Sequence, residues 1–194
     1  MNAPIVKTAS ASDEPSAVGV LLLAFSADPA TRWTWRDPQQ YVLHFPRFAK
    51  AFGGAAFTRG SAYYIDGFAG AALWLPPGVE PDEDALITLV QDTASEQSRG
   101  HVFEVLEQMG RYHPSEPHWY LPLMGVDPVH QGKGFGSALM QHALIPCDRD
   151  HRIAYLESTN PKNIPLYERH GFELLGTIQA GTSPPIFPML RKPR

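Results

Sequence analysis

The feature that most constrains the fold is a glycine-rich loop between an apolar extended segment and an apolar helical one. The loop reads Gln-Gly-Lys-Gly-Phe-Gly from Gln131 to Gly136, with Tyr120 to Val126 before it and Ala138 to Ile145 after it. Glycines permit positive φ angles and let backbone N–H groups approach a ligand closely. The start of a helix adds unpaired donors and the positive end of the helix dipole. The pattern predicts a strand, loop and helix that bind an anionic group such as a phosphate.

Spacing excludes two common nucleotide-binding loops. A dinucleotide fingerprint that starts at Gly132 requires a third glycine where this chain has Ser137. A P-loop requires a glycine at the position of Asp127 and a Ser or Thr at the position of Gly134. The remaining pattern is Gln-x-x-Gly-x-Gly, preceded by Val-Asp-Pro.

Composition indicates one globular α/β domain that spans residues 1–194. Apolar residues make up 43% of the 194 residues and charged ones 19%, which is ordinary for a protein with a full core. Sixteen basic and twenty acidic residues leave a net charge of −4, so neither nucleic acid nor an anionic membrane is expected as a partner. The apolar run Val18 to Phe25 is too short to span a bilayer and follows acidic residues, so no signal peptide is expected and the predicted location is cytoplasmic.

Neither the cysteine nor the histidines of the chain predict a metal centre. Cys147 is the single cysteine, so it has no partner for an internal disulfide and is interpreted as an indifferent thiol. His113, Glu116 and His118 lie in a segment interrupted by two prolines, which favours a plain loop over a metal site.

Hydrophobic periodicity and turn residues predict alternating helices and strands. The expected helices are Val18 to Phe25 with Ser12 as N-cap and Asp28-Pro29 as the stop, Pro38 to Phe52 despite Pro46, Glu83 to Gln91, His101 to Tyr112, Ala138 to Ile145 and Asn163 to His170. The expected strands are Ala62 to Ile65 and Phe68 to Leu75 around an Asp66-Gly67 hairpin turn, Tyr120 to Val126, Ile153 to Glu157, Phe172 to Gln179 and Phe187 to Arg191. This order is typical of one layered α/β domain without repeats.

A second block supports the ligand assignment. From Tyr155 to Phe172 the chain shows a strand, an Asn-bearing loop and a helix that carries Tyr167-x-x-x-Gly171-Phe172. Together with the glycine loop, this block resembles the GNAT superfamily of N-acetyltransferases. Several further segments resemble puromycin N-acetyltransferase-like members: Thr31-Arg32-Trp33, Ala72-Leu73-Trp74, Glu116 to Tyr120, Leu156 to Thr159, Asn163 to Arg169 and Arg191-Lys192-Pro193. The resemblance is dense from Trp119 to Phe172.

The resemblance implies an α/β acyltransferase fold with helices on both faces of a mixed central sheet. Two central parallel strands, ending at Val126 and Glu157, are expected to splay apart and hold the pantetheine arm of acetyl-CoA between them. Acceptor-side elements are expected in residues 1–118, the acetyl-CoA-binding core in 119–179 and a C-terminal strand in 186–192.

The resemblance also implies the residues that hold acetyl-CoA as cosubstrate, with no metal. Main-chain contacts are expected from Met124, Gly125 and Val126, and an amide near Met124 is expected to polarise the thioester carbonyl. Pyrophosphate contacts are expected from Gln131, Gly132, Lys133, Gly134, Phe135, Gly136 and Ser137. Asn160 and Asn163 suit the pantetheine amides, although a role as turn or helix caps is an equal alternative.

Tyr167 is the predicted general acid. Its phenol is neutral at pH 7 and suited to protonating the departing thiolate of CoA. The alternative is an aromatic residue that is simply buried.

Glu157 is the predicted base, because the strand from Trp119 to Val126 contains no acidic residue. It is expected to act directly or through a water molecule, or alternatively to hold the acceptor amine. Trp33, Trp35 and Phe45 are predicted to wall the acceptor site, with burial in the core as the alternative.

The predicted function is direct acetyl transfer from acetyl-CoA to the primary amine of a small molecule, by a monomer or homodimer. Two alternatives stay open: acetylation of a protein or peptide, and a non-catalytic CoA-binding sensor.

Overall fold

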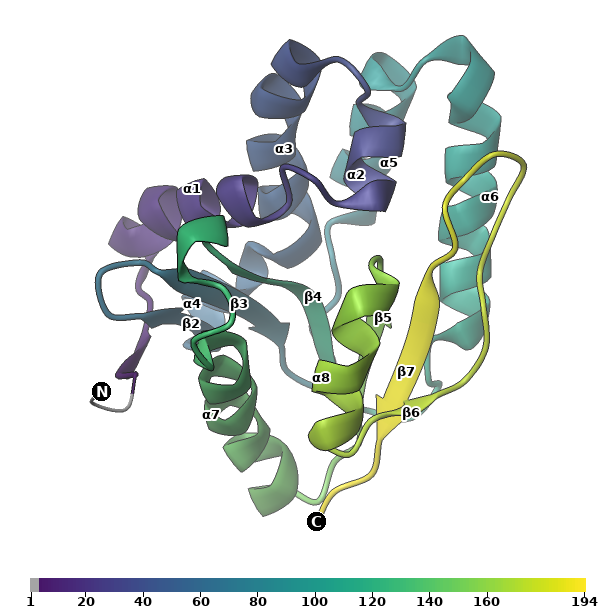
Figure 1. Ribbon diagram of the computed structural model, residues 1–194. Coiled ribbons are helices and arrows are strands. Elements are labelled where there is room, and N and C mark those ends of the chain that lie inside the picture. Colours follow the sequence, from purple (N-terminus) through teal and green to yellow (C-terminus); the bar gives the residue numbers. More distant parts are fainter. Residues whose placement is uncertain (1–3) are drawn as a thin grey trace.

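A computed structural model describes residues 4–194, which form a seven-stranded mixed sheet flanked by helices on both faces (Figure 1). The strands are β1 (Val6–Thr8), β2 (Ala62–Ile65), β3 (Gly70–Leu75), β4 (Trp119–Val126), β5 (Ala154–Ser158), β6 (Glu173–Leu174) and β7 (Phe187–Arg191). The helices are α1 (Glu14–Ala24), α2 (Pro29–Thr34), α3 (Pro38–Gly53), α4 (Ala55–Arg59), α5 (Glu83–Thr93), α6 (Glu96–Tyr112), α7 (Phe135–Arg149) and α8 (Ile164–Arg169).

The two central strands of the sheet are parallel and separate after three paired positions. The strand order is β1-β2-β3-β4-β5-β7-β6, and β4 with β5 is the parallel pair. Their register runs from Trp119 beside Ala154 to Leu121 beside Leu156 and stops there. Beyond that point β4 continues along β3, and β5 continues along β7. The sheet therefore opens between β4 and β5, as the resemblance implies.

Both faces of the sheet are buried, which explains the nearly continuous apolar run of β3. Leu73 and Leu75 face a core formed with α1 and α3. Ala72 and Trp74 point to the opposite core, formed with α7 and α8. Because successive side chains of a strand alternate between faces, a strand covered on both sides has to be apolar throughout.

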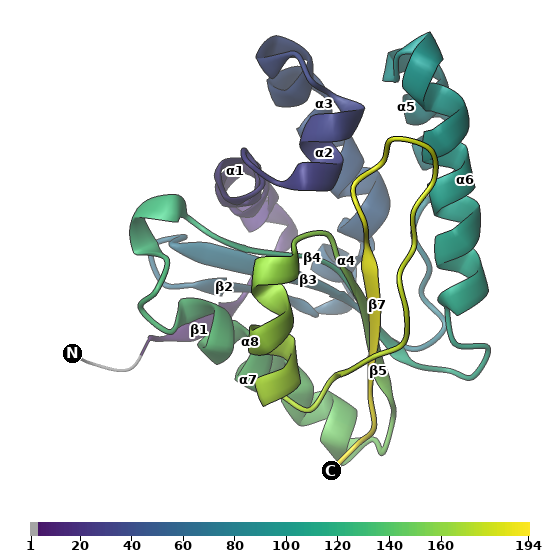
Figure 2. The ribbon, with the colours of Figure 1, turned by 45° about the vertical axis from the view of Figure 1, so that its right-hand side comes forward.

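The helices α5 and α6 and the segment between β6 and β7 extend the molecule beyond one end of the sheet (Figure 2). The segment between β6 and β7 runs beside α6, where Ile178 and Ile186 share a small core with Val105. The side-chain amide of Gln108 on α6 also donates to the Gln179 carbonyl at 3.0 Å. These contacts hold the segment against α6.

Several boundaries differ from the predicted ones. Ser12 is not the N-cap of α1; Ser10 and Asp13 form a capping box on a preceding 3₁₀ turn. The strand predicted over Phe172 to Gln179 is reduced to Glu173–Leu174, followed by a single bridging pair between Ile178 and Ile186. The short elements β1, α2 and α4 were not predicted.

Pro46 lies inside α3 as predicted, without ending the helix. Proline removes the hydrogen bond to the carbonyl four residues earlier, at Val42. Val42 is 56% exposed, so water can satisfy that carbonyl.

None of the helices in the described part of the chain is long and apolar enough to cross a membrane.

Candidate active site

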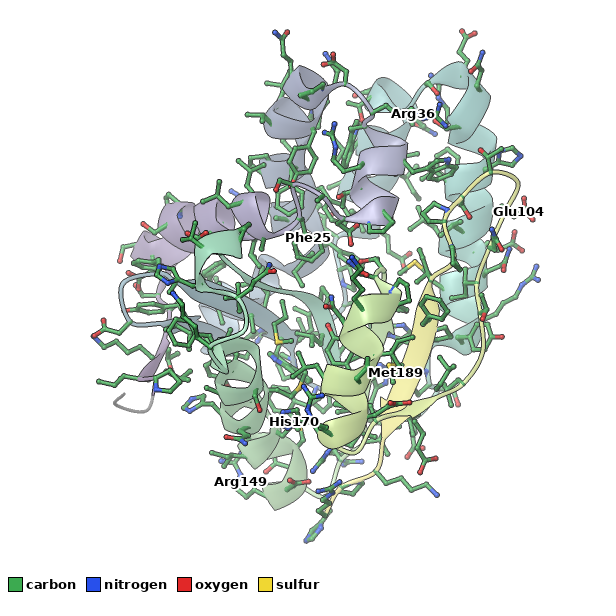
Figure 3. All side chains as sticks on the ribbon, viewed as in Figure 1. Phe25, Arg36, Glu104, Arg149, His170 and Met189 are labelled. Atoms are coloured by element: carbon green, nitrogen blue, oxygen red, sulfur yellow. The ribbon has the colours of Figure 1, made fainter. Side chains whose placement is uncertain are left out.

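A cleft of about 870 Å³ begins where β4 and β5 separate and extends to the helices on the acceptor side. Its walls come from the loop after α1, both diverging strands, the glycine loop, α8 and the α5–α6 pair. Phe25, labelled in Figure 3, lies at the end of α1 and lines it. Predicted site residues that line the cleft are Trp33, Trp35, Met124, Gly125, Val126, Gln131, Gly132, Gly134, Phe135, Gly136, Ser137, Glu157, Asn160, Asn163 and Tyr167.

The glycine loop has the geometry of an anion-binding helix start. Gly132 and Gly134 have φ angles of 73° and 84°, in the left-handed region, and Gly134 is the N-cap of α7. The Gln131 side-chain amide donates to the Val126 carbonyl at 3.1 Å, which fixes the loop to the end of β4. The amides of the first turn of α7 have no partner within the helix and are available to a ligand.

Lys133 is the one predicted cofactor residue that does not line the cleft. Its ammonium group donates to the Val129 carbonyl at 3.0 Å and thus folds back onto its own loop.

The edge of β4 that faces the splay is free along the predicted main-chain contacts. Met124, Gly125 and Val126 pair with Ala72, Ala71 and Gly70 of β3. Among the strands of the described chain, none pairs with the other edge of β4 beyond Leu121. A free strand edge suits an extended amide-bearing ligand that binds like an added strand.

Asn160 and Asn163 both line the cleft, but they differ in their present partners. The Asn160 side-chain carbonyl accepts from the Lys162 amide at 3.0 Å, so Asn160 acts as the cap that the sequence left as an alternative. Asn163 lies at the start of α8 and makes no capping bond through its side chain.

Tyr167 is buried, with 7% of its surface exposed, and its ring packs edge-on against Phe172. No hydrogen bond joins its hydroxyl to any side chain or backbone group of residues 4–194, and the residue borders the cleft. Burial raises the pKa of Tyr167, and the negative charge of Asp28 raises it further. The phenol is therefore held in its protonated form, as a general acid requires.

Asp28 is a site residue that the sequence analysis missed. The Asp28-Pro29 pair was interpreted as the stop of the first helix, whereas Asp28 is the N-cap of α2. One carboxylate oxygen accepts from the Ala30 and Thr31 amides at 3.1 and 3.0 Å, and the other accepts a short hydrogen bond from the Thr159 hydroxyl. An Asp followed by Pro is also a helix-start signal, so this cap was detectable from the sequence.

Glu157 lies at the end of β5 with its side chain only 3% exposed. One carboxylate oxygen accepts a hydrogen bond from the Tyr120 hydroxyl at 2.8 Å. The other has no hydrogen-bond partner among the described residues and lies 3.8 Å from Nδ1 of His113. Burial raises the pKa of Tyr120, and the contact with Glu157 raises it further. Tyr120 and His113 were not predicted as site residues, because only folding brings them close to Glu157.

The acceptor end of the cleft is mainly apolar. Trp33 and Trp35 line it, as expected, and their indole N–H groups donate to Thr182 at 3.3 Å and Thr93 at 3.0 Å. Phe45 is fully buried in the core and does not line the cleft, so burial in the core is the correct interpretation for this residue. The remaining apolar lining of this end is Phe48, Phe52, Leu86, Leu89, Val90, Val102, Val105, Leu106 and Met109.

Cys147 is buried in α7 away from the cleft. Burial raises its pKa to about 12, so the thiol is protonated at neutral pH and is a poor nucleophile. Within residues 4–194, no three His, Cys, Asp or Glu side chains are grouped so that they could hold a metal ion.

Comparisons with known proteins agree with this geometry. Residues 97–174 match the family model of the acetyltransferase (GNAT) domain. An uncharacterized N-acetyltransferase of Schizosaccharomyces pombe is 27% identical over 180 residues, which cover 86% of this chain and 73% of that protein.

Solved structures share the fold over nearly the whole chain. A Corynebacterium glutamicum protein described as histone acetyltransferase HPA2 and related acetyltransferase is 25% identical and superposes with a TM-score of 0.72 over 100% of this chain and 98% of its own. Arylalkylamine N-acetyltransferase 2 from Aedes aegypti is 14% identical, with a TM-score of 0.70 over 100% of both chains, and at that identity it shows the fold alone. The family match over residues 97–174, the splayed sheet and the glycine loop that opens α7 together show that the chain has the GNAT acetyltransferase fold.

Proposed function

We propose that the protein transfers the acetyl group of acetyl-CoA directly to the primary amine of a small molecule with an apolar body. The proposal rests on one observation. A single cleft is lined by the glycine loop, the free edge of β4, Tyr167, Glu157 and a group of apolar side chains. A donor thioester and an acceptor amine can meet there without leaving the cleft. The chain is proposed to act as one domain, with acceptor-side elements in residues 1–118, a cosubstrate core in 119–179 and a C-terminal strand in 186–192.

The residues at the splay fit acetyl-CoA, which supplies the activated acetyl group. The loop from Gln131 to Ser137 offers backbone amides for the pyrophosphate, and the free edge of β4 at Met124 to Val126 offers peptide groups for the pantetheine amides. Asn163, whose side chain is not used as a cap, is the better placed of the two asparagines to bind the same arm.

Tyr167 is proposed to protonate the departing thiolate. Its hydroxyl makes no hydrogen bond to the rest of the described chain, and its raised pKa keeps the proton on the phenol until a stronger base forms beside it. The negative charge of Asp28 helps to keep that proton in place.

Glu157 is proposed to take a proton from the acceptor amine. One of its oxygens is oriented by Tyr120, and the other is free of hydrogen bonds within the described chain. A carboxylate in this position also attracts an ammonium group, so binding and deprotonation of the acceptor use the same side chain.

The surroundings of the acceptor end favour a small molecule over a protein. The apolar side chains of α5 and α6 face the two tryptophans, and the Trp33 to Thr182 hydrogen bond joins α2 to the segment between β6 and β7. The pocket is thus bounded by elements from distant parts of the chain. Direct transfer is favoured because the lone cysteine is buried and protonated.

The test is release of free CoA thiol from acetyl-CoA by the purified protein. The acceptor panel contains arylalkylamines, alkylamines, polyamines and short peptides with free amino groups. Thiol release with apolar amines, together with a mass increase of one acetyl group on the amine, is expected. Activity on peptides alone would favour the protein acetyltransferase alternative. Tight binding of acetyl-CoA without turnover of any amine would favour the sensor alternative.

A further inference from the structure

A second cavity of about 370 Å³ lies behind the proposed base. It is lined by residues 77–80, residues 113–118 and Tyr120, none of which lines the main cleft. Glu157 belongs to the wall of the main cleft, and His113 belongs to the wall of the second cavity. The Glu157 Oε1 and His113 Nδ1 atoms are 3.8 Å apart. One carboxylate–imidazole contact therefore forms part of the partition between the two spaces.

The proposed reaction produces a proton that has to leave the site. An amine that arrives as an ammonium ion carries three protons on nitrogen, and the amide product keeps one. One of the two released protons goes to the sulfur of CoA through Tyr167. The other remains on the base, and Glu157 cannot act again until it has lost that proton. In the proposed complex, acetyl-CoA and the acceptor occupy the cleft on one side of Glu157, and the second cavity offers an exit on the other side.

We propose that His113 carries this proton from Glu157 to the second cavity. The inference rests on the proposed acetyl transfer to an amine. Neutral His113 with its proton on Nε2 presents the lone pair of Nδ1 to Glu157. Protonated Glu157 donates to Nδ1, and His113 then releases its Nε2 proton to water in the second cavity. Proton exchange with water returns His113 to the Nε2–H tautomer before the next turnover. The carboxylate is restored, and no bond other than N–H and O–H bonds is made or broken.

The free atoms of the pair support this path. Glu157 Oε1 and His113 Nε2 are buried, and neither has a hydrogen-bond partner among residues 4–194. The other oxygen of Glu157 is held by Tyr120, so Oε1 is the atom left to exchange a proton. The His113 ring packs edge-on against Tyr120 and Tyr155, with centroids 4.6 and 4.9 Å away, which fixes its position beside Glu157.

The other titratable groups around the pair are poor carriers. Burial raises the pKa of Tyr120 and of Tyr155, so both phenols keep their protons. Burial lowers the pKa of His118, whose Nδ1 is held by the Glu116 carbonyl at 2.8 Å. Tyr112 on α6 adds to the raised pKa of Tyr155, after burial and Glu157. Glu80 lies exposed at the rim of the second cavity, where it can receive a proton that has already passed His113. Histidine is the side-chain type suited to such a relay.

The test uses His113→Gln and His113→Ala in the full chain, with imidazole added to the second variant. Both variants are expected to lose at least about tenfold in kcat, with the affinity for acetyl-CoA unchanged. Imidazole is expected to enter the enlarged second cavity of His113→Ala and to restore the rate in proportion to its free-base form. A pH profile of the rescue measures that dependence. If His113 had only a structural role, the rate restored by imidazole would not depend on the concentration of its free-base form.

His142→Ala is the matched control. His142 also packs edge-on against a tyrosine ring, 4.8 Å from Tyr63, but it lines neither cavity. Its turnover is expected to stay within about twofold of wild type and to be insensitive to imidazole. The relay would be overturned if both folded His113 variants turned over at the wild-type rate. It would also be overturned if imidazole did not restore the rate of His113→Ala. Absence of thiol release by the wild-type protein would instead overturn the proposed acetyl transfer itself.

Discussion

At the scale of single residues, the proposed acid depends on a buried carboxylate that the sequence does not connect to it. Asp28 precedes Tyr167 by most of the chain, yet its charge contributes to the raised pKa of the phenol. Asp28 is itself held by the Thr159 hydroxyl and by two amides of α2. A single side chain thus joins the acceptor-side loop to the end of β5 and adds to the raised pKa of the proposed acid, which burial raises first.

Tyr167→Phe is expected to lower kcat by at least about tenfold, which corresponds to about 1.4 kcal/mol of activation free energy. The substitution removes only the hydroxyl, so the ring keeps its packing against Phe172 and the affinity for acetyl-CoA is expected to stay within about twofold. Steady-state kinetics and calorimetric titration with acetyl-CoA measure the two quantities. An unchanged kcat would remove Tyr167 from the mechanism.

Asp28→Ala is expected to lower the free energy of unfolding by about 1–2 kcal/mol, because the N-cap of α2 and the Thr159 contact are both lost. Asp28→Asn is the control, since asparagine caps a helix about as well as aspartate. Urea denaturation of both variants gives the comparison. Equal stability of the alanine variant and wild type would show that the cap is not needed.

At the scale of elements, the start of α7 connects local backbone conformation to the proposed binding of the cosubstrate. Gly134 is the N-cap of this helix at a positive φ, and no heavy atom lies within 4 Å of where its Cβ would be. The glycine is therefore required by backbone conformation and not by a lack of space.

Gly134→Ala is expected to cost about 1 kcal/mol of stability and to raise the KM for acetyl-CoA, because the strained loop no longer presents its amides correctly. Gly100→Ala is a suitable control, since Gly100 lies inside α6 with no atom near its Cβ position and alanine favours helix. Initial rates and thermal unfolding separate the two effects. A Gly134→Ala protein with wild-type KM for acetyl-CoA would contradict the loop assignment.

At the scale of the whole molecule, the C-terminal strand is joined to α7 by a partly buried ion pair. Arg191 on β7 is 3% exposed and makes a two-pronged contact with Asp148, at 2.7 and 2.8 Å. The hydrogen bonds from Arg191 lower the pKa of Asp148. Asp148 therefore binds protons less readily in the folded protein than in the unfolded chain.

This difference in proton binding determines how the free energy of unfolding changes with pH. The stabilisation by Asp148 is complete above the unfolded pKa of about 3.9, and it is lost as the pH falls through the lower folded pKa. Asp148→Asn is expected to lower the free energy of unfolding by about 1–3 kcal/mol at neutral pH and to make the protein less sensitive to acid.

Denaturation at several pH values measures both consequences. Asp150→Asn is the control, because Asp150 pairs with an exposed Arg149 and such surface pairs contribute less than about 1 kcal/mol. An Asp148→Asn variant with the acid sensitivity of wild type would contradict the assignment.

Binding in the splay is also expected to stabilise the whole fold, because the cleft joins elements from both ends of the chain. At a free acetyl-CoA concentration of about 100 times its Kd, the free energy of unfolding is expected to rise by about 2.7 kcal/mol. Thermal unfolding with and without acetyl-CoA measures the shift, and Gly134→Ala is expected to need a higher concentration for the same effect. An unfolding temperature that does not respond to acetyl-CoA would contradict binding to the folded state.

The sequence by itself determined the parts of this protein that depend on neighbouring residues. The strand, glycine loop and helix from Tyr120 to Ile145, the hairpin turn at Asp66-Gly67 and α3 with its internal proline were predicted and are confirmed, because φ preferences and hydrophobic periodicity act locally. The GNAT fold was predicted from two such local blocks and is confirmed by the splayed sheet and the family match. The narrower resemblance to puromycin N-acetyltransferase-like members stays a prediction.

Only the tertiary structure decided what surrounds the reacting groups. The hydrogen bond from Thr159 to Asp28 spans 131 residues, and the one from Tyr120 to Glu157 spans 37. Phe45 on α3 is buried and Trp33 on α2 borders the cleft, although both are aromatic residues of neighbouring helices. Such contacts depend on how helices pack across a sheet, and hydrophobic periodicity carries no information about which distant polar group a buried side chain will meet.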